Sequence, residues 1–141
     1  MGIDYGSKYI GLAVSDRSNT IAHSKEVITR TDLKKDLETI KDYLKDYEID
    51  EIVVGMPTSL NGTKGPRAQK TQQFINFLNN HLEIKVSTWD ERFTTLIADQ
   101  SMIDADISRK KRKKMVDKIA AALILQNYLD YLNKKDGEQD E

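Results

Sequence analysis

The sequence of 141 residues contains no cysteine and only two histidines, His23 and His81. Without cysteine the chain can form neither a disulfide framework nor a thiolate metal site, as expected for a protein of a reducing compartment. Zinc sites are built mostly from cysteine and histidine, so we do not expect a histidine-rich zinc site. Any metal chemistry is therefore expected to use acidic side chains.

Long apolar runs are also absent, because none reaches the roughly 18 residues of a membrane-spanning helix. The first residues, MGIDYGSK, lack the basic and then apolar segments of a signal peptide. We therefore expect a soluble, cytoplasmic protein with no membrane partner. The net charge of −1 says nothing about an anionic partner, so any such signal must come from how the charges are distributed along the chain. The aromatic residues, 7% of the chain, are scattered, which argues against a base-stacking platform.

The apolar pattern predicts two strands joined as a hairpin and then strands that alternate with helices. The predicted strands are residues 2–6, Tyr9–Ser15, 20–28, Ile52–Val54 and Ile84–Trp89. The predicted helices are Asp32–Tyr47, Pro66–His81, Thr94–Ile103 and Ser108–Leu132. This order predicts a mixed β-sheet covered by α-helices in one domain, residues 1–132, followed by a polar, disordered tail, residues 133–141.

Acidic residues stand where the predicted strands end, which is where such sheets carry their chemistry. Asp4 ends the first strand, and Asp90 and Glu91 follow the last one. A third candidate, Asp117, lies at helical spacing from the apolar Ala121 and is therefore predicted to face the sheet.

A carboxylate that faces the core needs a compensating partner. For Asp117 this partner is either a metal ion or a lysine such as Lys113 or Lys114, and the sequence leaves both open. Three carboxylates from separate elements suit Mg²⁺ or Mn²⁺, which prefer oxygen ligands. Two such ions about 4 Å apart can activate water against a phosphodiester.

The segment 108–118 contains seven basic residues and one acid, a local charge of +6. A charge run is usually a solvated surface, but this one begins the helix that carries Asp117, which favours binding of a phosphate backbone. The glycine-containing segment LNGTKGPR places Lys64 and Arg67 at the start of the helix that begins at Pro66, an arrangement that suits an anion or a flexible connection equally well.

Four segments in this order resemble the YqgF family of pre-ribosomal-RNA nucleases and Holliday-junction-resolvase-like proteins. They are GIDYGSKYIGLAVSD, IVVGMPTSLNGTKGPR, WDERFTT and SRKKRKKMVDKIAAALILQ, which together span residues 2 to 126. The resemblance implies an RNase H-like α/β fold with a five-stranded mixed sheet flanked by α-helices. It also implies that Asp4, Glu91 and Asp117 bind the catalytic Mg²⁺ or Mn²⁺.

The same resemblance implies that a loop lies near the site. The loop residues are Asn61, Gly62, Pro66 and Arg67. The candidate nucleic-acid contacts are then Lys8, Asn61, Arg67, Arg92, Lys110, Lys113 and Lys114. Family members commonly have several residues before the first motif, so we expect a first strand of only three or four residues here.

The family's role implies a metal-dependent nuclease that matures the 5′ end of pre-16S rRNA, as a monomer or a homodimer. One alternative is a Holliday junction resolvase that acts on branched DNA, and another is an RNA-binding protein without catalysis. A nucleotide phosphotransferase is a further class with a similar first hairpin, but it needs two such domains around the nucleotide.

Overall fold

A computed structural model of the chain describes residues 1–57, 65–90 and 108–139, without the side chains of residues 109, 110, 112–118 and 136–139. The predicted helix Thr94–Ile103 lies outside the described residues. No helix in the described ranges is long and apolar enough to cross a membrane.

The described strands form one five-stranded sheet with the order β3-β2-β1-β4-β5. The strands are β1 (Gly2–Tyr5), β2 (Tyr9–Ser15), β3 (Ala22–Thr29), β4 (Glu51–Met56) and β5 (Lys85–Asp90). β2 is antiparallel to β1 and β3, whereas β4 is parallel to β1 and β5. The predicted hairpin and the mixed sheet are therefore confirmed, as is the short first strand.

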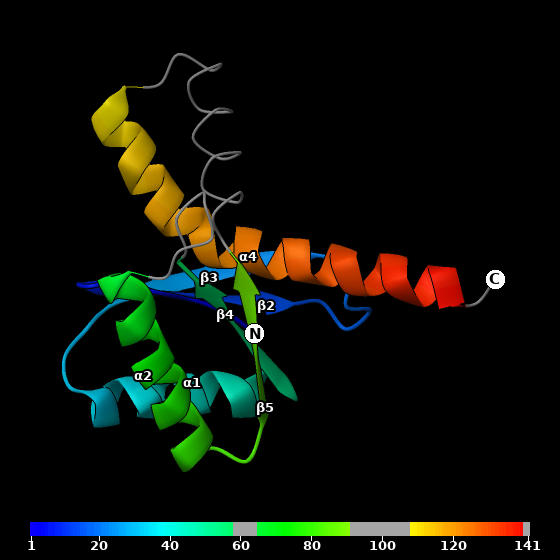
Figure 1. The fold of residues 1–141 in the computed structure, drawn as a ribbon, viewed down its shortest axis with the longest axis horizontal. Coiled ribbons are helices and arrows are strands. Elements are labelled where there is room, and N and C mark those ends of the chain that lie inside the picture. The colour runs from blue at the N-terminus through cyan, green and yellow to red at the C-terminus, as the bar shows by residue number, and fades with distance from the viewer. Residues whose placement is uncertain (58–64, 91–107, 140–141) are drawn as a thin grey trace.

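Helices cover both faces of this sheet, as Figure 1 shows. α1 (Leu33–Asp46) and α2 (Pro66–His81) pack on one face, and α4 (Arg109–Gln139) lies on the other. Ile52, Val53 and Val54 of β4 are 0%, 1% and 0% exposed, so this strand is buried on both faces. The five-stranded mixed sheet flanked by helices confirms the predicted α/β architecture.

Side chains alternate between the two faces along each strand. Ile3 and Val54 belong to the core under α1 and α2, whereas Val53 belongs to the core under α4. Gly2 faces α4, and a Cβ atom at this position would lie 2.7 Å from both the carbonyl oxygen of Ala121 and the Cβ of Leu125. The absence of a side chain at Gly2 is therefore what allows α4 to approach the central strand.

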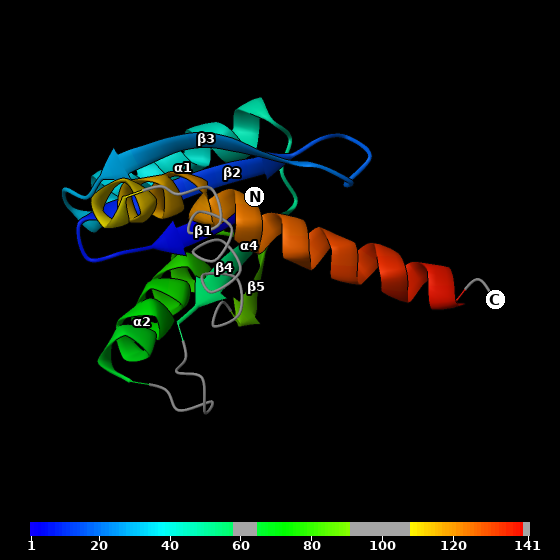
Figure 2. The ribbon, with the colours of Figure 1, turned by 90° about the horizontal axis from the view of Figure 1, so that it is seen from above.

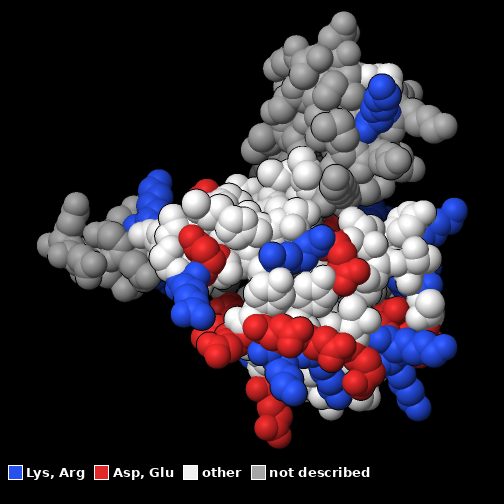
Figure 3. Space-filling view, turned by 180° about the vertical axis from the view of Figure 1, so that it is seen from behind, with Lys and Arg blue, Asp and Glu red and all other residues white. Residues whose placement is uncertain are grey.

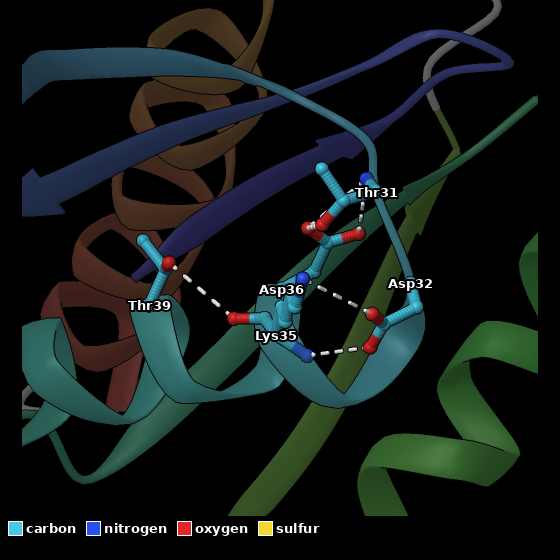
Figure 4. A network of polar contacts seen from close by, with 5 residues as sticks. All are labelled: Thr31, Asp32, Lys35, Asp36 and Thr39. Carbon is cyan, nitrogen blue, oxygen red and sulfur yellow. Dashed lines mark hydrogen bonds and ion pairs between the residues drawn. The ribbon is translucent and has the colours of Figure 1, made fainter.

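The start of α1 is fixed by side chains, as Figure 4 shows. Asp32 is the N-cap, and its carboxylate accepts a hydrogen bond of 3.0 Å from the backbone N–H of Lys35. Asp36, only 5% exposed, accepts hydrogen bonds from the backbone N–H and the hydroxyl of Thr31. Asp32 is therefore the N-cap, and Thr31 supports the first turn.

The last helix begins where predicted but ends later. The hydroxyl of Ser108 accepts a hydrogen bond of 3.4 Å from the backbone N–H of Lys111, as expected of an N-cap. α4 runs to Gln139, so the predicted end at Leu132 is wrong. The amide of Asn133 donates a hydrogen bond of 3.0 Å to the backbone oxygen of Asn19, which holds the additional turns.

Figures 1 and 2 show that these last turns extend beyond the edge of the sheet.

Candidate functional site

The carboxyl ends of four strands meet at one edge of the sheet. β1, β4 and β5 are parallel, and β3 runs in the same direction because both β1 and β3 are antiparallel to β2. The turn between β1 and β2 lies at this edge, and so does the start of α2, because α2 leads from the end of β4 back to the start of β5. We call this end of the sheet, where the four strands finish, the carboxyl edge.

Asp4 lies at the carboxyl edge, on the central strand. It is the third residue of β1 and is level with Gly11 of β2. Its side chain is partly buried and, by strand alternation from Gly2, lies on the α4 face. The main chain thus places a carboxylate at the centre of the sheet, beneath the helix that carries Asp117.

Only one of the three predicted metal ligands has a described side chain. β5 ends at Asp90, so Glu91 directly follows the carboxyl edge but lies outside the described residues. Asp117 is part of α4, and its side chain also lies outside the description. Among the described side chains, no group of three or more His, Asp or Glu could hold a metal ion. The proposed ligand set therefore remains a prediction.

The turn between β1 and β2, which carries the predicted contact Lys8, is held by an arginine that sequence reasoning missed. Lys8 itself is exposed. The guanidinium Nη1 of Arg30 donates hydrogen bonds to the backbone oxygens of Gly6, at 3.0 Å, and Ser7, at 3.1 Å. The backbone N–H of Arg30 also donates to the backbone oxygen of Lys8 at 2.8 Å. No sequence spacing indicated this contact, because Arg30 stands more than 20 residues from the turn.

Arg67 is exposed in the first turn of α2, at the carboxyl edge. Pro66 opens this helix, as predicted, and Gly65 precedes it as the N-cap. The hydroxyl of Thr71 donates a hydrogen bond of 3.0 Å to the backbone oxygen of Arg67. The helix start therefore presents a cation beside N–H groups that can bind an anion.

The other predicted nucleic-acid contacts cannot be placed in the same way. Asn61 and Arg92 lie outside the described residues. Lys110, Lys113 and Lys114 are in the first turns of α4, but their side chains lie outside the description.

The opposite edge, which is the end of the sheet where these four strands begin, has a different electrostatic character. A groove of about 720 Å³ lies there, between the α1–β4 loop, the β2–β3 turn and α4. More acidic residues than lysines and arginines line this groove. The acidic residues are Asp16, Asp46, Glu48, Asp50 and Glu51. In Figure 3, acidic side chains form a band across the lower part of the molecule, with basic side chains among them. This edge therefore repels a polyanion, which favours the carboxyl edge for a phosphate backbone.

A hydrogen-bonded tyrosine fixes α4 on the parallel strands. The hydroxyl of Tyr128 donates to the carboxylate of Glu51, which also accepts a hydrogen bond of 2.7 Å from the hydroxyl of Ser87. Burial and then the hydrogen bond to Glu51 raise the pKa of the Tyr128 phenol above its usual value of 10. The phenol therefore stays protonated and keeps donating at neutral pH.

Three aromatic side chains meet on the α4 face. The Trp89 ring centroid lies 6.1 Å from that of Tyr128, with 75° between the ring planes, and 5.8 Å from that of Tyr131. Aromatic residues that are scattered along the sequence therefore come together on this face. Trp89 and the two tyrosines are about 40 residues apart along the chain, and no sequence spacing predicts their contact.

Comparisons with known proteins show the family of the chain. A protein of Halothermothrix orenii named "Putative pre-16S rRNA nuclease" is 50% identical over 97% of this chain and 98% of its own length. A protein of Desulfitobacterium hafniense with the same name is 47% identical over 100% of this chain and 98% of its own length.

Among solved structures, the fowlpox virus Holliday junction resolvase matches with a TM-score of 0.48 and 15% identity, over 92% of this chain and 97% of the viral chain. The family model described as "RuvX: Holliday junction resolvase" matches residues 1–131. With this match and with relatives near 50% identity over almost the whole length, the chain belongs to the RuvX family.

Proposed function

We propose that the protein is a divalent-metal-dependent nuclease that hydrolyses a phosphodiester bond of pre-16S rRNA at the carboxyl edge of its sheet. The observation that carries this proposal is the position of Asp4, a partly buried carboxylate on the central strand. The chain that carries it is 50% identical to a protein named "Putative pre-16S rRNA nuclease". Such a substrate is made and processed in the cytoplasm, where the protein would act.

The proposed metal ligands are Asp4, Glu91 and Asp117. Their chemistry fits Mg²⁺ or Mn²⁺, because all three offer carboxylate oxygens and the whole chain lacks cysteine. When bound, the metal would supply an activated water and stabilise the leaving oxygen of the phosphodiester. Asp4 is carried by a strand with partners on both sides, which fixes its backbone for this task.

The remaining residues of the carboxyl edge would hold the substrate. Lys8 and Arg67 are exposed cations on two segments whose backbones are fixed by hydrogen bonds. Contacts of this kind bind phosphates without reading the base sequence and position the backbone over Asp4. In the proposed complex, Arg92, Asn61 and the lysines at 110, 113 and 114 extend this contact.

The test is cleavage of a pre-16S rRNA fragment that contains the mature 5′ end, with Mg²⁺ or Mn²⁺ and with EDTA. We expect cleavage by the wild type with metal only, and a loss of at least about 100-fold in Asp4→Asn. Asp42→Asn is the matched control, because Asp42 is an exposed acid on α1 and should keep full activity. Cleavage that persists in EDTA, or in folded Asp4→Asn protein, contradicts the proposal.

Branched DNA is the second candidate substrate, because the matching family model is described by Holliday junction resolution. A four-way DNA junction in the same assay separates the two. Cleavage of the junction with no cleavage of the rRNA fragment would favour the resolvase activity. Metal-independent binding of RNA without any cleavage would instead favour the role of an RNA-binding protein.

A further inference from the structure

The side chains of Lys8 and Arg30 lie next to each other at the carboxyl edge. Tyr9 of β2 is level with Thr29 of β3 in an antiparallel pair, so Lys8 and Arg30 are opposite each other one step further on. The backbone N–H of Arg30 donates a hydrogen bond of 2.8 Å to the backbone oxygen of Lys8, so the pairing continues to this step. Residues opposite each other in such a pair point to the same face, with Cβ atoms about 5 Å apart.

These two cations belong to the face of the sheet that α1 and α2 cover. Ile28 packs against the core under these helices, and strand alternation puts Arg30, two residues later, on the same side. The Arg30 guanidinium lies 4.4 Å from the centroid of the Tyr5 ring, which stacks on Phe74 of α2. Arg67 precedes Phe74 by about two helical turns, so it lies on the same side of α2, about 10 Å nearer the carboxyl edge.

The Arg30 guanidinium is held in place but keeps donors for a further partner. Its Nη1 donates to the backbone oxygens of Gly6 and Ser7, whereas the N–H groups of Nε and Nη2 have no acceptor within the described part of the chain. Arg30 is partly exposed. A planar guanidinium with two neighbouring N–H donors on one side matches the oxygens of a phosphate.

The charge around this pair favours an anion. No carboxylate among the described residues forms an ion pair with Lys8 or Arg30. Like charges directly opposite each other destabilise a sheet. An anion bound beside both side chains would remove this repulsion.

The pair is close to Asp4 along the chain but lies on the other face. Gly6, which accepts a hydrogen bond of 3.0 Å from Arg30, stands two residues after Asp4, so the guanidinium lies roughly 10 Å from the Asp4 backbone. Asp4 is on the α4 face, whereas Arg30 is on the face of α1 and α2. A strand bound at Asp4 therefore reaches Arg30 by crossing over the β1–β2 turn.

We propose that Arg30 binds a backbone phosphate of the RNA, beside the phosphate contacted by Lys8 and on the face of the sheet opposite Asp4. The inference rests on the proposed function, because it extends the path of the same substrate beyond the site of cleavage. The guanidinium is already ordered by the turn and by the Tyr5 ring, so little side-chain entropy is lost on binding. The contact holds the RNA backbone without reading its bases.

The salt dependence of RNA binding separates this role from the structural role of Arg30 in the turn. Fluorescence anisotropy of a labelled single-stranded RNA of about ten nucleotides is measured with full-length protein in EDTA, at several KCl concentrations. Arg30→Gln keeps a side-chain N–H for the turn but has no charge. We expect it to lower the slope of log affinity against log salt concentration by about 0.7 and to weaken binding about 5-fold at the lowest salt.

Two further variants serve as controls. Arg30→Lys keeps the charge and should retain the slope of the wild type. Arg17→Gln should bind like the wild type, because Arg17 is an exposed arginine at the acidic groove of the opposite edge. Urea denaturation shows how far each substitution changes the free energy of unfolding.

A second measurement locates the contact on the RNA. A set of RNAs, each with one uncharged methylphosphonate in place of a phosphate, is bound to the wild type and to Arg30→Gln. At one position the neutral group should weaken binding of the wild type about 5-fold but leave binding of Arg30→Gln unchanged, because the cation for that phosphate is already missing.

Several outcomes would overturn the proposal. They are an unchanged slope in Arg30→Gln, an equal loss of slope in Arg30→Lys, methylphosphonate effects that are the same in both proteins, or no binding of the RNA. Failure of the proposed function gives a different result. The Arg30-dependent slope would then persist in a protein that cleaves neither substrate when Mg²⁺ or Mn²⁺ is added.

Discussion

The ring of Tyr5 stacks on the ring of Phe74, with 4.1 Å between the centroids and 13° between the planes. Tyr5 ends β1 directly after Asp4, and Phe74 is a buried residue of α2. The guanidinium of Arg30 also lies over the Tyr5 ring, 4.4 Å from its centroid. One aromatic side chain therefore connects the strand of Asp4 to α2 and to the arginine that holds the β1–β2 turn.

This relationship predicts the effect of removing the Tyr5 ring. Tyr5→Leu keeps an apolar side chain but loses both the stack and the contact with Arg30, so we expect a loss of about 1–2 kcal/mol in the free energy of unfolding. Urea denaturation followed by Trp89 fluorescence measures this change. Tyr5→Phe keeps the ring and should cost much less. Equal losses in the two variants would show that the hydroxyl, and not the stack, matters.

A second prediction concerns the close contact between β1 and α4. In Gly2→Ala the new Cβ would meet the Ala121 carbonyl and Leu125, so α4 must move and stability should fall by about 1–3 kcal/mol. Because α4 carries Asp117, nuclease activity should fall as well. The matched control is Gly65→Ala, since a Cβ at Gly65 would meet nothing within 4 Å. A stability of Gly2→Ala equal to that of Gly65→Ala would refute the tight contact.

A third prediction concerns the cations of the carboxyl edge. If Lys8 and Arg67 each contact one phosphate, Lys8→Ala and Arg67→Ala should each reduce the slope of log affinity against log salt concentration by about 0.7–0.9. Fluorescence anisotropy of labelled RNA at several KCl concentrations gives these slopes. Lys45→Ala serves as the control, because Lys45 is an exposed cation in the last turn of α1. Identical slopes in all four proteins would exclude the assigned contacts.

A fourth prediction concerns the pH dependence of stability through Asp16. Its carboxylate accepts hydrogen bonds from the backbone N–H groups of Thr20, at 2.8 Å, and Ile21, at 3.1 Å, within the β2–β3 turn. These bonds, that of Thr20 first, lower the pKa of Asp16 below its usual value of 3.8. Because the folded state has the lower pKa, the stabilisation is present above about pH 4 and is lost as the pH falls through the folded pKa.

The measurement for Asp16 compares unfolding free energies of the wild type and Asp16→Asn from neutral to acidic pH. Asparagine keeps an oxygen acceptor but has no charge, so the wild type should be the more stable protein above about pH 5. The difference should shrink as the pH falls below about 4. A difference that stays constant over the whole range would mean that the charge of Asp16 contributes nothing.

Local patterns in the sequence predicted much of the fold. The apolar run Tyr9–Ser15 and the leucine spacing after Asp32 are set by residues that are neighbours in the chain. The same holds for Pro66 at the start of α2 and Ser108 at the start of α4. These features depend on contacts within a few residues, and for that reason composition and spacing are sufficient to predict them.

The sequence by itself determined the order of the elements, the hairpin, the helix starts and the acids at the strand ends. Only the tertiary structure decided that α4 continues past Leu132, that Gly2 is where the helix meets the sheet, and that Arg30 holds the β1–β2 turn. It also decided that the rings of Trp89 and Tyr131 meet. Each of these contacts joins segments far apart in the chain, so it depends on how the helices and the sheet pack and not on local spacing.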